Sequence, residues 1–178
     1  MSDVSALYLS AMRPRLNVIQ SEYLRGTSRG RMILGRLREA LDRPVGDEPE
    51  AVRWSLHGVP DGLGYWPFTP LERASWVSFA LYAHHQRGLH FDRMQRDGVA
   101  FVEALRVLRS RSGASVCLSR LRGLGDPVEA GRALFPLVEG LREARVPFDH
   151  ALLALDLASV GSDAFAGVVL PSWLARVS

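Results

Sequence analysis

The sequence contains no lysine, and all 22 of its basic residues other than histidine are arginine. This absence excludes the phosphate-binding loop of P-loop enzymes, which requires a lysine. The single cysteine, Cys117, can form no disulfide within the chain and cannot by itself supply the thiolates of a zinc site. Apolar runs are interrupted within a few residues, so none approaches the roughly 18 residues of a membrane helix, and no basic segment precedes an apolar stretch at the start of the chain. We therefore expect a cytoplasmic protein with no membrane contact.

Patterns that carry catalysis or metal binding are missing as well. His84, His85 and His90 stand near Asp92, but adjacent helical residues point about 100° apart. His90 also lies beyond the helix-ending Gly88, so no two metal ligands are one helical turn apart. The chain has no G-x-S-x-G motif, and its Gly-Leu-Gly segments lack the third glycine of a dinucleotide site. We expect no enzyme activity, no metal and no cofactor.

Helix signals recur along the chain, which has 178 residues and is 47% hydrophobic. Thr69-Pro70-Leu71-Glu72 has the pattern of a capping box with proline at the first helical position, and Asp126-Pro127-Val128-Glu129 repeats it. No segment shows sustained alternation of apolar and polar residues between hairpin turns. The sequence therefore predicts a single all-α domain over 1–178, a compact bundle of about eight or nine helices. These helices are expected near 3–23 (bent or broken by Pro14), 29–42, 48–57, 70–87, 98–110, 115–122, 127–144, 149–159 and 171–176.

A loop rich in glycine, proline and aromatic residues is expected at 58–69, with the sequence GVPDGLGYWPFT. We predict an ordered surface loop pinned by Tyr65, Trp66 and Phe68, which could serve as a docking element.

The charges are segregated along the chain although the net charge is only +3. Residues 1–46 hold eight arginines against four acidic residues, and residues 87–122 hold eight against three. Acidic residues are in excess in 47–61 and in 123–178. A GC-rich genome would explain an excess of arginine but not this segregation. Two basic blocks with the acidic surplus elsewhere are typical of a surface that binds a polyanion, and planar guanidinium groups suit phosphate recognition.

Helical geometry places many of these arginines beside the expected core. In the segment 29–42, Ile33, Leu34, Leu37 and Leu41 share one face, and arginines border it on both sides. Two interpretations stay open for each row: a nucleic-acid-binding surface with little sequence preference, or a solvated face whose arginines pair with Glu39 or Glu103. The candidate nucleic-acid-binding residues are Arg29, Arg31, Arg36, Arg38, Arg93, Arg96, Arg106, Arg109, Arg111, Arg120 and Arg122.

Phe91 stands among the arginines of the second block, next to His90 and Met94. Its ring would suit stacking on an unpaired base, and burial in the core is the alternative.

The order of these pieces resembles the CasB family, the small subunit of the type I-E CRISPR surveillance complex Cascade. The resemblance covers roughly 29–176. It is carried by Ser28-Arg29-Gly30-Arg31 leading into Leu34-Gly35-Arg36-Leu37-Arg38, by Phe79-Ala80-Leu81-Tyr82-Ala83-His84-His85-Gln86, by Gly98 through Leu108 with Leu118-Ser119-Arg120-Leu121, by Val146-Pro147-Phe148-Asp149, and by Trp173. The chain departs from the family near Glu103, where members often have an arginine, and at 114–117, where adjacent arginines are common.

This resemblance implies a non-catalytic, all-α subunit present in two copies in the complex. Its implied partners are the large subunit, the crRNA-binding backbone subunits, a second copy of itself, single-stranded DNA and possibly crRNA. Its implied task is to stabilise the R-loop in antiviral defence by holding the displaced, non-target DNA strand in a basic groove.

Two other classes of function remain. One is a helical scaffold whose arginines contact acidic protein surfaces, and the other is a helix-turn-helix regulator that binds duplex DNA. The strand-holding hypothesis requires the arginines of 29–43 and of 87–122 to converge into one continuous groove.

Overall fold

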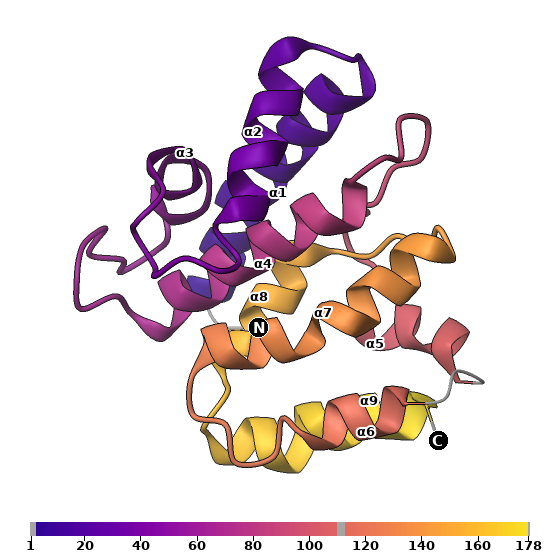
Figure 1. Ribbon diagram of the computed structural model, residues 1–178. Coiled ribbons are helices and arrows are strands. Elements are labelled where there is room, and N and C mark those ends of the chain that lie inside the picture. Colours follow the sequence, from indigo (N-terminus) through magenta and orange to yellow (C-terminus); the bar gives the residue numbers. More distant parts are fainter. Residues whose placement is uncertain (1–2, 110–112, 178) are drawn as a thin grey trace.

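The computed structural model describes residues 3–109 and 113–177, and its regular structure in these ranges is helical apart from one isolated bridge between Gln95 and Phe148. The predicted all-α class is confirmed (Figure 1). The α-helices described are α1 (Asp3–Leu24), α2 (Ser28–Glu39), α3 (Pro49–Ala51), α4 (Pro70–Gln86), α5 (Phe101–Ala104), α6 (Ala114–Ser119), α7 (Pro127–Glu143), α8 (His150–Ala158) and α9 (Leu170–Val177). Two short π-helical turns, η1 (Val52–Leu56) and η3 (Phe165–Val169), and a 3₁₀ turn, η2 (Leu105–Leu108), adjoin them. None of the helices in these ranges has the length and apolar character needed to span a bilayer.

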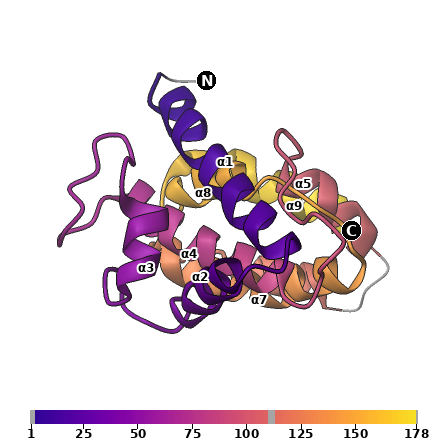
Figure 2. The same cartoon turned by 90° about the horizontal axis from the view of Figure 1, so that it is seen from above.

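Helix α4 forms the centre of the bundle, and most of its residues are buried. It packs against α7, α8, α2 and η1. Seen from above, α1 and α8 lie on one side of α4, and α2 and α7 lie on the other (Figure 2). Helices α6 and α9 lie side by side at the end of the bundle opposite the α1–α2 hairpin (Figure 1). The core of the protein therefore forms around one central helix, and the other helices cover it.

Two glycines allow helices to approach closely. A Cβ atom on Gly131 of α7 would lie 2.4 Å from a Cγ atom of Val77 in α4. A Cβ on Gly30 of α2 would lie 2.5 Å from backbone atoms of Glu22 and Tyr23 in α1. The absence of a side chain at these positions lets α7 and α2 pack directly against their neighbours.

The helix starts predicted from the sequence are formed by side-chain caps. Thr69 Oγ1 accepts a bond from the Glu72 backbone N–H (3.2 Å), and Glu72 Oε2 accepts one from the Thr69 N–H (2.8 Å), which completes the capping box of α4. Asp126 caps α7 and Asp149 caps α8. These local patterns are sufficient to place the three helices.

Other helix boundaries differ from the expectation. The first helix runs from Asp3 to Leu24 without a break, with Pro14 inside it. The helix expected at 98–110 starts only at Phe101, because Gly98 has a φ of +81° and Ala100 is extended, and it narrows to a 3₁₀ turn at Leu105.

The loop at 58–69 is held in place, but only one of the three residues expected to pin it, Phe68, takes part. Glu72 is fully buried, and its Oε1 atom accepts a bond from the Gly64 N–H (2.6 Å). Phe68 is half-buried and its ring lies against Gly46. The expectation that Tyr65 and Trp66 pin the loop is wrong, because their side chains are 66% and 79% exposed.

A buried carboxylate, that of Asp149, joins α1 to the start of α8. Asp149 is fully buried at the start of α8 and accepts bonds from Arg13 Nε (2.7 Å), Gln95 Nε2 (3.0 Å) and the Gly98 N–H (2.8 Å), besides the N–H groups of α8 that it caps. These bonds tie α1, the segment before α5 and α8 together, so the carboxylate is fully satisfied in the core.

Two buried histidines continue this network in a fixed tautomer. Gln95 donates from Nε2, so its Oε1 must accept the bond from His150 Nδ1 (3.0 Å). His150 Nε2 then accepts from His85 Nδ1 (3.2 Å), which leaves His85 Nε2 as an unprotonated acceptor. Burial lowers the pKa of His85 to about 3 and lowers that of His150 as well, so both rings are neutral.

Candidate nucleic-acid interface

Helix α2 carries four of the eight arginines of the first basic block, Arg29, Arg31, Arg36 and Arg38. It buries Ile33, Leu34 and Leu37 against α1 and α4, and Thr27 caps its start. Arg31 folds back to donate to the Gly26 carbonyl (2.6 Å), and Arg36 pairs with Glu39 (3.0 Å).

Several candidate arginines have no hydrogen bond or ion pair from their side chains to the residues described. They are Arg29, Arg38, Arg93, Arg96, Arg120 and Arg122, and all but the half-buried Arg38 are exposed. Unpaired guanidinium groups at a surface are available to phosphates without first breaking an internal bond.

The two basic blocks meet at His84, in the last turn of α4. The ring of His84 lies beside the backbone carbonyl of Arg38. The guanidinium groups of Arg38 and Arg87 are also close enough to lower the pKa of this ring. Burial is the main reason why the pKa of His84 is lowered, and the neighbouring Glu139 opposes the shift. The end of α2 and the start of the loop after α4 are therefore adjacent.

Glu139 of α7 partly neutralises this meeting point. Its Oε2 atom pairs with Arg87 (3.0 Å) and with Arg142 (3.1 Å). The Glu139 carboxylate thus pairs with two guanidinium groups. Arg38 lies near them and makes no ion pair with a described residue. Arg38, Arg87, Arg142 and Glu139 together therefore carry a net positive charge.

The blocks meet a second time through Arg132 of α7. Arg132 donates from Nε to the Leu41 carbonyl (2.6 Å) and from Nη2 to the Arg43 carbonyl (3.0 Å), which places it against the segment after α2. It also lines a hollow of about 580 Å³ between α6 and α7, together with Arg120. We define the α2–α7 basic face as Arg38, Arg43, Arg87, Arg120 and Arg132.

Sequence reasoning missed Arg132. It lies in 123–178, where acidic residues are in excess, and only its position beside the end of α2 in the fold makes it part of the basic face. The periodicity of α7 does place Arg132 with the exposed Glu129 and Pro136, but it does not show which neighbour that surface faces.

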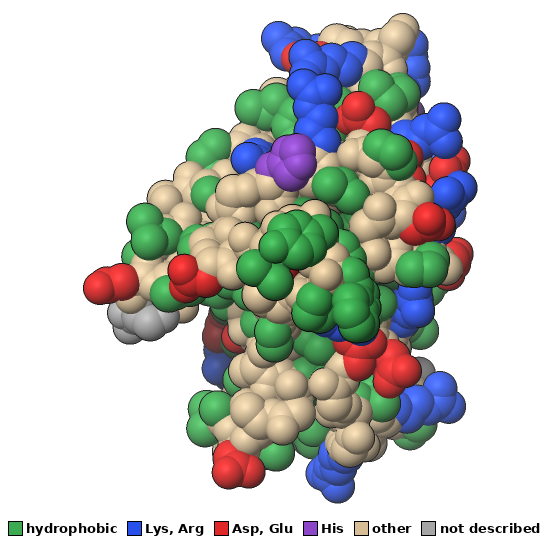
Figure 3. Space-filling view, turned by 90° about the vertical axis from the view of Figure 1, so that its left-hand side faces the viewer, with side chains coloured by type: hydrophobic (Ala, Val, Ile, Leu, Met, Phe, Trp, Pro, Cys, Tyr) green, Lys and Arg blue, Asp and Glu red, His purple; other side chains and the backbone are tan. Residues whose placement is uncertain are grey.

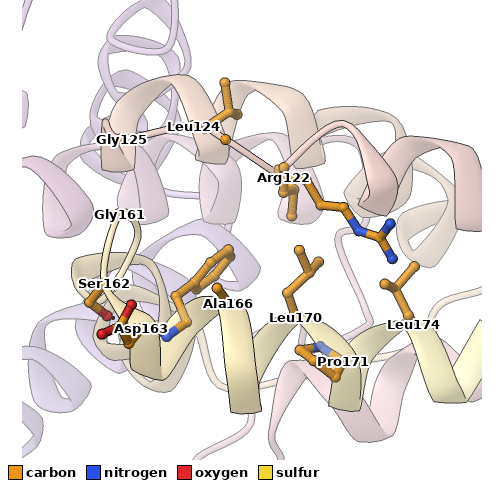
Figure 4. A pocket seen from close by; sticks show the side chains of 13 residues that line it. Arg122, Leu124, Gly125, Gly161, Ser162, Asp163, Ala166, Leu170, Pro171 and Leu174 are labelled. Atoms are coloured by element: carbon orange, nitrogen blue, oxygen red, sulfur yellow. Dashed lines mark hydrogen bonds between the residues drawn. The ribbon is translucent and has the colours of Figure 1, made fainter.

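Some candidate arginines lie elsewhere. Arg106 pairs with Glu103 (3.2 Å), which also binds Arg176 (3.3 Å), and the helices near it lie far from α2 in both ribbon views (Figures 1 and 2). Arg122 lines a separate hollow of about 620 Å³ and extends over α9 toward Leu174 (Figure 4). Arg109 is exposed, and Arg111 falls outside the described residues. The arginines therefore do not form one groove containing every predicted member, and their binding role remains a prediction.

The face on which the 58–69 loop projects has a different character. A hydrophobic patch occupies its centre, and arginines gather at its top and along its right-hand edge, toward the side of α2 and α7 (Figure 3). The exposed Leu63, Tyr65 and Trp66 belong to this loop. The basic and apolar surfaces are thus separate.

Comparison with known proteins places this helical, arginine-faced bundle among the CRISPR-associated proteins. The family model of CRISPR-associated protein Cse2 matches residues 34–170. The chain therefore belongs to the Cse2 family, also called CasB, whose members are subunits of the type I-E Cascade complex. The resemblance seen in the sequence is confirmed, and the chain is a subunit of a multi-subunit CRISPR complex.

A solved structure supports the same fold. The crystal structure of CasB from Thermobifida fusca matches with a TM-score of 0.69 at 21% sequence identity, covering 99% of this chain and 98% of that chain. At this identity the match shows the fold. No curated protein sequence matches the chain.

Proposed function

We propose that this subunit binds single-stranded nucleic acid without sequence preference, and that it stabilises the R-loop by holding the displaced non-target DNA strand, without catalysis. The observation that carries the proposal is the meeting of the two basic blocks on the α2–α7 basic face, at His84 and at Arg132. A sugar-phosphate backbone bound there would be recognised by charge and not by base sequence.

The ion pairs on this surface are weak competitors for phosphate. Arg43 pairs with Glu39 at 3.7 Å and with Asp47 at 4.0 Å, and all three side chains are about half exposed or more. Exposed pairs of this kind contribute at most about 1 kcal/mol. A phosphate that approaches Arg43 can therefore replace them at little cost.

Small contributions are sufficient for this task. The guide–target heteroduplex is about as stable as the DNA duplex that it replaces, so R-loop formation is a nearly balanced exchange. Interactions that retain the displaced strand slow reannealing and shift the balance toward the open state.

Titration of single-stranded DNA at two salt concentrations tests the proposal. A variant with Arg38→Gln, Arg93→Gln, Arg96→Gln and Arg120→Gln removes four cations that have no side-chain partner among the described residues, so we expect the fold to be unaffected. The log–log slope of affinity against salt should become shallower by about 0.7 for each phosphate that an arginine no longer neutralises.

Arg53→Gln is the matched control, because Arg53 is exposed, lies in the acidic segment and pairs only loosely with Glu50 (3.9 Å). It should leave the slope unchanged. Binding that is absent, or that does not depend on salt, both for the isolated subunit and in the assembled complex, would refute the proposal. A preference for duplex DNA would favour a regulator instead.

We propose that the protein partners are the large subunit, the crRNA-binding backbone subunits and a second copy of this chain. The exposed aromatic side chains of the 58–69 loop support a protein contact, because a solvent-exposed tryptophan on a well-held loop is typical of an interface anchor.

A further inference from the structure

Phe91 is the most exposed large apolar side chain among the described residues, at 97% exposure. Of the two interpretations that the sequence leaves open, burial in the core is therefore wrong. A benzyl group kept fully in water contributes almost nothing to the stability of the isolated fold, so its ring is available to contact a ligand.

The loop that carries Phe91 is held from below by one buried side chain. Gln86, at the end of α4, is fully buried. Its Nε2 atom donates to the carbonyls of Leu89 (2.6 Å) and Asp92 (2.8 Å), and its Oε1 atom accepts from the Met94 N–H (3.1 Å). These bonds bracket Phe91 on both sides, so the exposed ring sits on an ordered backbone.

Tyr23 of α1 fixes the same loop from another direction. Its hydroxyl accepts a bond from the Gly88 N–H (3.1 Å), and its ring stacks on that of His90 at a centroid distance of 5.0 Å. The exposed His90 thus keeps one ring contact with the protein, through Tyr23, while the next residue, Phe91, is almost fully in the solvent.

Two exposed arginines follow Phe91 in the same loop. Arg93 and Arg96 are exposed, and their side chains make no hydrogen bond or ion pair with any described residue. The nearby carboxylate of Asp92 pairs with Arg145 (3.5 Å). The loop also continues directly from Arg87, a member of the α2–α7 basic face. An occupant should therefore combine flat apolar surface with regularly spaced negative charge.

We propose that Phe91 is a base-stacking residue: an unpaired base of a bound single strand stacks on its ring while Arg93 and Arg96 bind the adjacent phosphates. A single strand has both an accessible base face and a phosphate at every nucleotide, which an apolar protein surface does not. This inference rests on the proposed single-strand binding and identifies the element that contacts the bases.

The test uses the assembled complex with 2-aminopurine placed at successive positions of the displaced strand, because stacking on an aromatic ring changes the fluorescence of this base. With the unmodified subunit, at least one position should respond. Phe91→Ala should abolish that response and weaken strand retention roughly tenfold, Phe91→Trp should preserve both, and Phe91→Leu should behave like alanine. Val168→Ala, at another exposed apolar residue, should change neither.

A displaced strand that lacks bases at the responsive positions provides the second readout. It should be retained equally by the unmodified subunit and by Phe91→Ala. If Phe91→Ala retains the normal strand as well as the unmodified subunit does, while retention still depends on salt, the stacking role is refuted and the proposed function stands. The stacking role is also refuted if the substitution impairs assembly but not strand retention, which would indicate a protein contact. If the unmodified complex does not retain the strand at all, the proposed function fails.

Discussion

Arg13 Nε donates a 2.7 Å hydrogen bond to Asp149 Oδ2, joining two residues 136 positions apart. The Asp149 side chain is fully buried and the Arg13 side chain is 27% exposed. The first helix is thereby fixed to the start of α8, and the loop that precedes α5 is fixed to both.

Asp149→Ala should lower the free energy of unfolding by about 3 kcal/mol, because it removes a helix cap, leaves Arg13 without its acceptor and takes one of two acceptors from Gln95 Nε2. Urea denaturation measures this change. Asp163→Ala, at an exposed carboxylate near η3, is the control and should have little effect. A decrease of less than about 1 kcal/mol at Asp149 would show that the network is not important for stability.

Stability should fall on acidification because His85 and His150 are buried as neutral rings. The pKa of His85 in the folded state is about 3, compared with 6.5 in the unfolded chain, and that of His150 is lowered too. Between these pH values the unfolded chain binds more protons, so stability is full above pH 6.5 and decreases toward pH 3. Denaturation midpoints measured from about pH 8 to about pH 4 test this, and a flat profile would contradict it.

Asp156 acts in the opposite direction. Burial raises its pKa to about 6 from 3.8, so its contribution to stability is full below pH 3.8 and is lost as the pH rises through 6. Asp156→Asn should therefore stabilise the fold by up to about 3 kcal/mol at about pH 7.5 and have little effect at about pH 4. A stabilisation of equal size at both pH values would show that the charge is not its cause.

The 58–69 loop should contribute to assembly and not to folding. Trp66→Ala removes a side chain that is 79% exposed, so we expect an unchanged melting temperature. We expect weaker association with the other subunits, measured by co-purification of the complex. Phe68→Ala is the informative comparison, because Phe68 is half-buried and its removal should lower the melting temperature. Full assembly with Trp66→Ala would refute a docking role for this loop.

The features predicted correctly from the sequence are those set by neighbouring residues. The capping pairs at Thr69, Asp126 and Asp149 satisfy backbone N–H groups within a single turn, so they can be recognised locally. The helical class follows from the same signals, together with the absence of alternating segments.

The features that the sequence left open depend on packing between distant segments. Phe91 is exposed on a loop that Tyr23 of α1 holds from 65 positions away, and this bond leaves no local pattern in the sequence. Arg132 joins the basic face only because α7 lies against the end of α2. Arg106 was a candidate from its position on a helix, but it pairs with Glu103, the solvated-face alternative. Periodicity shows which face of a helix is buried, but not what the other face meets.

Protection of the displaced strand in the assembled complex tests the central claim most directly. The complex carrying the fourfold substitution of Arg38, Arg93, Arg96 and Arg120 by glutamine should assemble and load its guide normally. Its displaced strand should become open to a single-strand nuclease, while the Arg53→Gln complex keeps the strand protected. Equal protection of the strand in all three complexes, the unmodified one included, would contradict the account.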